Sequence, residues 1–225
     1  MSRCALSTRP GIKSILLYLL SITLFSACDK QERVKHDSTF QNGNVIFQSL
    51  RSGTSDAIQL ATHSDYSHCG IIFWEGDKCY VYEALQRVNP TPIEMFLQRS
   101  AHYAVRRSKD AATLFLTEEK VNAFIRAYYK KFNGKPYDVL YDASDDKIYC
   151  SELVWKLYDV AAHVDVGEWR PLREFDLKND VVQEQLKLTY GDNIPLDERI
   201  ISPEALFVSD KFVTVIENSS HSQNH

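Results

Sequence analysis

Ser67–Leu85, SHCGIIFWEGDKCYVYEAL, is the stretch of the chain whose pattern says most about the fold. Two runs, 67–74 and 79–85, are rich in aromatic and β-branched residues, as strands are. Between them lies Glu75-Gly76-Asp77-Lys78, a polar segment with the composition of a tight turn. The segment therefore predicts an antiparallel hairpin.

The register of this hairpin decides which polar side chains meet. If Trp74 lies opposite Cys79, then His68 faces Leu85, and Glu83 is the diagonal neighbour of His68 on the same sheet face. Diagonal neighbours lie roughly 7–8 Å apart between backbones, which two long side chains can bridge. A slip of one residue would place His68 and Glu83 on opposite faces. We therefore expect a His–Glu pair in the favoured register.

Cys150 stands at the predicted start of a helix. The apolar residues recur at helical spacing, namely Cys150, Leu153, Val154, Leu157 and Tyr158. The positive end of a helix dipole stabilises a thiolate, and the free N–H groups there can hold an oxyanion. A thiol in this place becomes a nucleophile if one histidine takes its proton and a third group orients that histidine. His68 and Glu83 are the candidates, although each of the three residues alone is more often structural.

The other segments mix strands and helices. The predicted strands are 45–47, 103–107 and 113–116, and the predicted helices are 55–62 and one that begins near Thr117. In the second helix the acidic pair Glu118-Glu119 suits the N-terminal turn. The order predicts an α+β fold with an antiparallel sheet packed against helices.

The N-terminus has the pattern of an export signal. Basic residues precede an almost wholly apolar run, 15–25, that is too short to span a bilayer comfortably. The stretch Leu24-Phe25-Ser26-Ala27-Cys28 resembles a bacterial lipobox, in which the cysteine is lipidated. We expect a signal peptide over 1–27 and a flexible tether over 28–42. The alternative is an ordinary cleaved signal in which Cys28 is incidental.

Composition limits the class of protein. A chain of 225 residues with 44% hydrophobic and 12% aromatic residues suits one packed globular domain once the signal is set aside. The formal net charge of -4 argues against nucleic acid as a partner, because phosphate binding needs a concentrated basic face. We expect a monomer without a cofactor.

The cysteine count favours a free thiol. Cys4 lies in the signal and Cys28 is the predicted lipidation site, which leaves Cys69, Cys79 and Cys150. An odd number cannot close a disulfide framework. No CxxC or HExxH spacing occurs, so we predict no metal site. Cys69 and Cys79 are interpreted as small packing residues of the two strands.

Three short blocks carry a resemblance to a known family. They are Tyr66-Ser67-His68-Cys69-Gly70-Ile71-Ile72, Tyr82-Glu83-Ala84 and Tyr149-Cys150-Ser151-Glu152-Leu153-Val154. In this order they are similar to the blocks of the YiiX/YebB-like branch of the NlpC/P60 superfamily, which is circularly permuted relative to papain. The resemblance covers most of 43–208, which we take as the catalytic domain, and it leaves 209–225 as a C-terminal extension ending in a polar tail.

The resemblance implies a permuted papain-like fold and a thiol mechanism. Cys150 would be the nucleophile, His68 the base and Glu83 the residue that orients His68. Tyr66, Ser67 and Tyr149 flank these residues and are candidates for lining the cleft or donating to the oxyanion, or for packing. No cofactor is implied.

The substrate is left open by the sequence. A lipoprotein exported to the bacterial cell envelope, anchored to a membrane on the periplasmic side, meets peptidoglycan, so an amidase acting on stem peptides is the first hypothesis. Related permuted enzymes act on acyl lipids, which makes an acyl-lipid or thioester hydrolase or acyltransferase the second. The third is a noncatalytic envelope binding protein, against which intact Cys150, His68 and Glu83 argue.

Overall fold

A computed structural model of the 225-residue chain describes residues 39–142 and 144–218. The predicted signal peptide, most of the tether and the lipidation site Cys28 lie outside the described residues. Within the described residues no helix is both long and apolar enough to cross a membrane.

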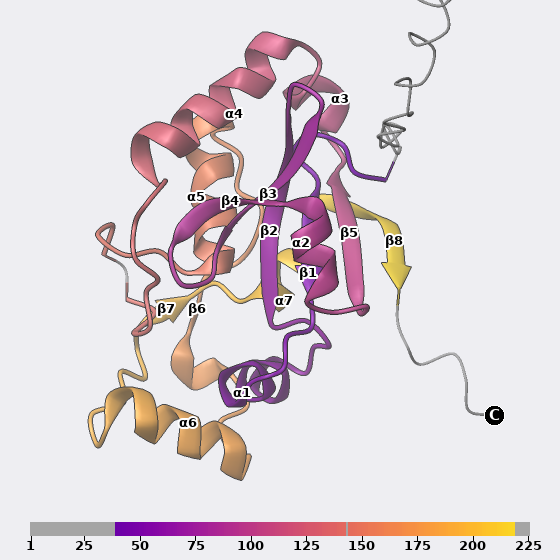
Figure 1. The fold of residues 1–225 in the computed structure, drawn as a ribbon. Coiled ribbons are helices and arrows are strands. Elements are labelled where there is room, and N and C mark those ends of the chain that lie inside the picture. Colours follow the sequence, from indigo (N-terminus) through magenta and orange to yellow (C-terminus); the bar gives the residue numbers. More distant parts are fainter. Residues whose placement is uncertain (1–38, 143, 219–225) are drawn as a thin grey trace, which may run out of the picture. The chain divides into compact units, whose positions relative to one another are not determined.

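Strands and helices alternate irregularly along the chain (Figure 1). The strands are β1 (Val45–Gln48), β2 (His68–Glu75), β3 (Lys78–Ala84), β4 (Val88–Pro92), β5 (Tyr103–Ser108), β6 (Arg170–Pro171), β7 (Arg199–Ile200) and β8 (Phe212–Asn218). The helices are α1 (Gly53–Thr62), α2 (Ile93–Gln98), α3 (Ala111–Leu114), α4 (Glu118–Lys131), α5 (Cys150–Ala162), the 3-10 helix η1 (Leu172–Glu174), α6 (Asp180–Tyr190) and α7 (Pro203–Phe207). The predicted α+β class is confirmed.

The main sheet has six strands in the order β4-β3-β2-β1-β5-β8, and each neighbouring pair is antiparallel. The predicted hairpin register is confirmed, because Trp74 pairs with Cys79 and Gly70 with Glu83. Continued toward the start of β2, this register makes Glu83 the diagonal neighbour of His68.

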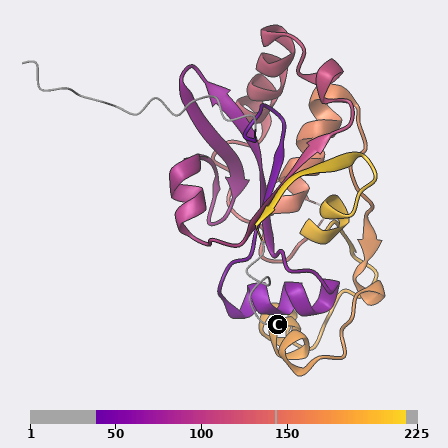
Figure 2. The same ribbon diagram turned by 90° about the vertical axis from the view of Figure 1, so that its right-hand side faces the viewer.

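Helices cover both faces of the sheet, as Figure 2 shows with α2 in magenta on one side and α5 in orange on the other. One face carries a large core to which α4 and α5 contribute, with Cys69, Ile71 and Phe73 of β2 pointing into it. The other face carries a smaller core with Ile72, Trp74 and residues of α2. The alternation of side chains along β2 thus places Cys69 toward α5, and His68 toward α2.

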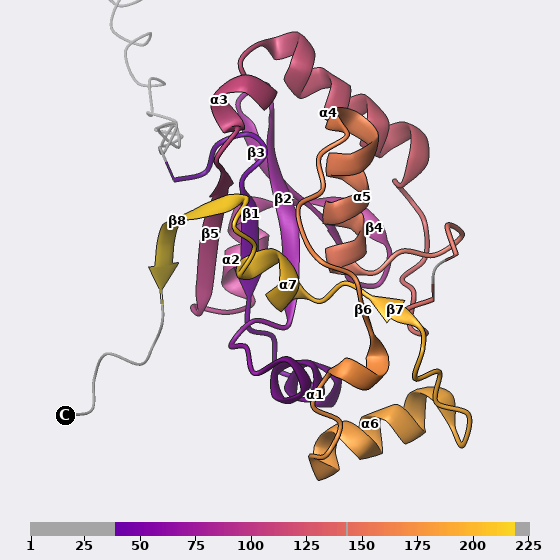
Figure 3. The same ribbon diagram turned by 180° about the vertical axis from the view of Figure 1, so that it is seen from behind.

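Beyond one end of the sheet, α1 and α6 pack against each other (Figure 3). The side chain of Ser52 caps α1 by accepting a hydrogen bond from Ser55 N, and the side chain of Asn179 caps α6. The two-stranded sheet of β6 and β7 connects this region with the large core. Residues of α1, η1, α6 and β7 line a cavity in this region.

Two segments differ from the sequence-based prediction. The predicted strand over 113–116 is wrong, since Asp110 is followed by one short helical turn, α3, whose N–H groups bond back to Asp110 and Ala111. No strand was predicted within the C-terminal extension 209–225, but β8 lies there, pairs with β5 and buries Phe212. Thr117 does cap α4 as predicted, because its side chain accepts from Lys120 N.

Candidate active site

His68 and Glu83 form a buried pair. His68 Nε2 lies 2.6 Å from Glu83 Oε2, and both side chains are almost fully buried. Gly70, which pairs with Glu83 across the hairpin, leaves no room for a side chain: a Cβ there would lie 2.4 Å from Val81 Cγ1 and 3.2 Å from Glu83 Cβ. The absence of a side chain at Gly70 lets the two strands close and Glu83 approach His68.

Cys150 is the first residue of α5, as predicted. The preceding residue, Tyr149, has extended backbone, and its N–H donates to the carboxylate of Glu152 at 3.2 Å. Ser151 Oγ donates to the Ile201 carbonyl at 2.7 Å, and Tyr149 Oη accepts from Ile201 N at 3.1 Å. The start of α5 is therefore fixed to the segment before α7, and the first-turn N–H groups of a helix, which have no acceptor within it, lie beside the Cys150 sulfur.

The surroundings of Cys150 favour a thiolate. A hydrogen bond from the Cys69 thiol lowers the pKa of Cys150, and a hydrogen bond and the charge of His68 lower it further, so that burial is outweighed. Burial by itself would lower the pKa of His68, but hydrogen bonds and charges of Cys150 and Glu83 raise it to about 9. The two shifts describe a thiolate–imidazolium pair across neutral pH.

Glu83 remains charged although it is buried. Burial would raise the pKa of its carboxyl, but the hydrogen bond and charge of His68, followed by Arg99, lower it below the ordinary value. An ionised Glu83 accepts the Nε2–H of His68, which fixes the tautomer and leaves Nδ1 for Cys150. His68 thus interacts with both Glu83 and Cys150, the first residue of α5.

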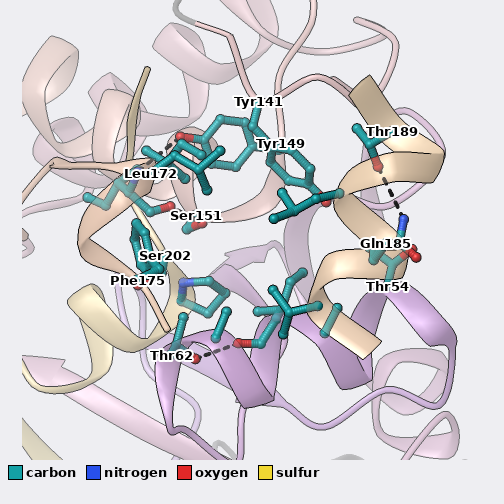
Figure 4. Close-up of a pocket in the computed structure, with 18 of the residues that line it drawn as sticks. Thr54, Thr62, Tyr141, Tyr149, Ser151, Leu172, Phe175, Gln185, Thr189 and Ser202 are labelled. Carbon is teal, nitrogen blue, oxygen red and sulfur yellow. Dashed lines mark hydrogen bonds between the residues drawn. The ribbon is translucent and has the colours of Figure 1, made fainter. Parts of the chain in front are cut away.

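Cys150 opens onto an apolar cavity of about 110 Å³. Figure 4 shows its wall, with Tyr141 and Tyr149 on one side, α1 with Thr54 and Thr62 opposite them, and Gln185 and Thr189 of α6. Most of the lining is aliphatic or aromatic, including Ala57, Ile58, Leu172, Phe175, Leu177, Val182, Leu186 and Ile201. A group that fills this cavity would therefore contact mainly carbon atoms.

The other predicted cleft residues are divided by the structure. Tyr149 lines the cavity. Tyr66 does not line it, because its hydroxyl donates to Glu217 of β8 at 3.1 Å and its ring packs on Phe207. Ser67 Oγ accepts from Leu50 N at 3.1 Å and is likewise outside the lining. Tyr66 and Ser67 thus support the segments around His68 instead of the cavity.

Sequence reasoning missed Arg99 and the cavity. Arg99 follows α2, and its Nη2 lies 2.7 and 2.8 Å from the two carboxylate oxygens of Glu83. The available signal was physical: a carboxylate expected on a buried strand face requires a cationic neighbour. The α6 wall was missed because the periodic apolar residues Val182 and Leu186 were not interpreted as a helix.

Comparison with known proteins identifies related chains. Residues 39–216 match the model of a family described as permuted papain-like amidases of the YaeF/YiiX type, family C92. The uncharacterized protein YiiX of Escherichia coli strain K12 is 42% identical over 177 residues, which make up 78% of this chain and 85% of YiiX. A crystal structure of yiiX from Escherichia coli O157:H7 has a TM-score of 0.74 and 44% identity, and covers 80% of this chain and 98% of that one.

The description of that crystal structure calls the E. coli protein a metalloprotein. Across residues 39–142 and 144–218 of the present chain, no group of three or more His, Cys, Asp or Glu side chains is placed to hold a metal ion. The residues of these ranges do not fit a metal centre.

Proposed function

Because the chain belongs to the permuted papain-like amidase family of YaeF and YiiX and is a cysteine hydrolase, we propose that Cys150 is its nucleophile, His68 its general base and Glu83 the residue that orients His68. The observation that carries this proposal is the buried His68–Glu83 pair, with 2.6 Å between His68 Nε2 and Glu83 Oε2, together with Cys150 at the start of α5, whose thiol pKa is lowered by His68. These three residues match the roles that a thiol hydrolase requires. The placement of this protein in the NlpC/P60 superfamily stays a prediction.

The proposed reaction has two steps. The Cys150 thiolate attacks the carbonyl carbon, and His68 gives its proton to the leaving nitrogen as the carbon–nitrogen bond breaks, which leaves an acyl thioester on Cys150. His68 then takes a proton from water, whose oxygen attacks the thioester and releases the acid and the thiolate. Because α5 begins at Cys150, we expect its first-turn N–H groups to stabilise the oxyanion in both steps.

We propose that the group entering the cavity is an apolar acyl chain. Cys150 and the apolar side chains of α1 and α6 line the same cavity, so a chain that extends from the attacked carbonyl into it contacts mainly carbon atoms. Burying each methylene group contributes about 0.8 kcal/mol. A polar stem peptide would lose hydrogen bonds to water there without replacement. The acyl-lipid hypothesis is therefore favoured over the peptidoglycan hypothesis. We propose that the bond cleaved is an amide, because the family is described as amidases.

A series of N-acyl arylamides with straight chains of increasing length tests this proposal. We expect kcat/KM to rise about fourfold for each added methylene, until the cavity is filled, because 1.4 kcal/mol corresponds to tenfold. Cys150→Ala should abolish turnover. Leu186→Asn should remove much of the dependence on chain length, because Leu186 lines the cavity.

Leu188→Asn is the matched control, since Leu188 lies on the same helix with its side chain mostly exposed. A dependence on length that survives in Leu186→Asn would contradict the assignment of the cavity. Release of peptides from purified sacculi without turnover of any acyl amide would instead favour the peptidoglycan hypothesis. Measuring kcat/KM for aryl esters of the same acyl chains compares ester cleavage with amide cleavage.

A further inference from the structure

Arg99 contacts the buried carboxylate on which the proposed base depends. Its Nη2 lies 2.7 Å from Glu83 Oε1 and 2.8 Å from Oε2, the oxygen that also contacts His68. Glu83 is 2% exposed and the Arg99 side chain 24%, so the guanidinium separates the carboxylate from solvent. Arg99, Glu83, His68 and Cys150 thus form a continuous polar chain from the surface to the sulfur.

The position of Arg99 is set by α2 and by the strand beside His68. The Arg99 guanidinium lies 4.6 Å from the centre of the Phe96 ring, and the same ring stacks against the imidazole of His68 at 5.9 Å. Gln48, the partner of His68 in β1, donates from Nε2 to the Phe96 carbonyl at 2.8 Å and to the Ser100 carbonyl at 3.3 Å. The strand that positions His68 therefore also holds the end of α2, which lies over the sheet in Figure 1.

We propose that Arg99 is a positioning residue of the active site, which keeps Glu83 ionised and oriented so that Glu83 can hold the His68 ring. This inference rests on the proposed function of Cys150, His68 and Glu83. Arg99 itself lies beyond Glu83 and does not line the cavity next to Cys150. It acts through the carboxylate.

The physical need for Arg99 follows from burial. A carboxylate removed from water is unstable unless cations or donors replace its hydration. The titratable groups around Glu83 are His68 and Cys69 from β2, Tyr128 from α4 and, through His68, Cys150 from α5, while Arg99 supplies a fixed positive charge. Arginine stays charged at every pH of interest, whereas the charge of His68 changes during the reaction. Arg99 therefore maintains the carboxylate in both protonation states of His68.

Removal of the Arg99 charge should shift the pH dependence of Cys150 reactivity in one direction. Without Arg99, burial raises the pKa of Glu83, and below the new value Glu83 becomes neutral. His68 then loses its counter-charge, its own pKa falls, and the thiolate–imidazolium pair is lost at acidic pH. The acid limb of Cys150 reactivity should therefore move to higher pH.

The test is the rate of iodoacetamide alkylation of Cys150 in the full-length protein between pH 4 and 9, with the modified cysteine located by mass spectrometry. For Arg99→Ala we expect the midpoint of the acid limb to rise by about one pH unit or more. The midpoint in Arg99→Lys should lie between those of the wild type and Arg99→Ala, because lysine retains the positive charge. Arg126→Ala, which removes an exposed arginine from α4, should leave the profile unchanged.

The outcomes separate this inference from the proposed function. An activated Cys150 in the wild type with an unshifted limb in Arg99→Ala would overturn the role of Arg99 alone. A uniform loss of rate at all pH values, with no shift of the limb, would also overturn it, because that result indicates only a loosened fold. A wild-type Cys150 that reacts like an ordinary thiol would instead count against the catalytic triad itself.

Discussion

Two residues that are adjacent in the sequence favour the thiolate form of Cys150. His68 and Cys69 both belong to the start of β2, and both lower the pKa of Cys150. Burial, followed by Cys150, raises the pKa of Cys69 well above its ordinary value, so Cys69 remains a neutral donor. The sequence-based interpretation of Cys69 as a packing residue is therefore incomplete, because its thiol also supports the thiolate.

Replacement of Cys69 by Ala should raise the pKa of Cys150. A hydrogen bond to a charged group contributes about 1.5–3 kcal/mol, which corresponds to a rise of roughly one to two units. The measurement is the pH midpoint of Cys150 alkylation. Cys69→Ser retains a donor and should lie close to the wild type, and Cys79→Ala serves as the control. An unchanged midpoint in Cys69→Ala would show that the thiol does not stabilise the thiolate.

The His68–Glu83 pair could be predicted from sequence because it depends on one local hairpin. A short polar turn sets the register, and the register sets which side chains share a face. Arg99 could not be placed in this way, because its contact with Glu83 depends on how α2 packs on the sheet. That packing is fixed by Gln48 and Phe96, which no local pattern connects.

The strands β4 and β8 were missed for physical reasons. Val88–Pro92 contains two prolines, which weaken a strand prediction because proline lacks an N–H group. β4 tolerates them because it lies at the edge of the sheet, where one side needs no partner. β8 was missed because it pairs with β5, more than a hundred residues earlier, and buries little besides Phe212.

The closeness of β2 and β3 gives a prediction for Gly70. In Gly70→Ala the new Cβ would meet Val81 Cγ1 at 2.4 Å and the Tyr82 carbonyl oxygen at 2.9 Å, and the backbone oxygen cannot move aside cheaply. We expect the free energy of unfolding to fall by about 1–3 kcal/mol, and the activity to fall because the Glu83 carboxylate is displaced. Urea unfolding and kcat/KM measure these effects.

Gly53→Ala is the matched control for Gly70→Ala. A Cβ at Gly53, at the start of α1, would meet only Gln185 Oε1 at 3.8 Å. We expect its stability to equal or slightly exceed that of the wild type, since alanine favours a helix. Equal stability of the two variants would contradict the close approach of the hairpin strands.

For the chain taken together, we propose a lipoprotein of the bacterial envelope. The proposal rests on the apolar run 15–25 followed by the lipobox-like residues 24–28, which lie outside the described structure. An apolar cavity beside Cys150, the proposed nucleophile, suits a substrate that is itself found in membranes, and a lipid anchor would keep the enzyme near it.

Cys28→Ser should abolish incorporation of labelled fatty acid and release the protein from the membrane or leave it uncleaved. Cys4→Ser, which changes a cysteine of the predicted signal peptide, should incorporate labelled fatty acid to the same extent as the wild type. Metabolic labelling with membrane fractionation measures both effects. Membrane association and labelling that persist in Cys28→Ser would defeat the lipoprotein proposal.

The catalytic role of Cys150 and His68 is tested most directly by alkylation of the full-length protein with iodoacetamide across a pH series, with wild type and His68→Ala compared by mass spectrometry. The predicted result is fast labelling of Cys150 at pH 6–7, well below the ordinary thiol pKa of roughly 8.5, and loss of this reactivity in His68→Ala. Labelling of Cys150 that follows an ordinary thiol titration in both proteins would contradict the activated pair.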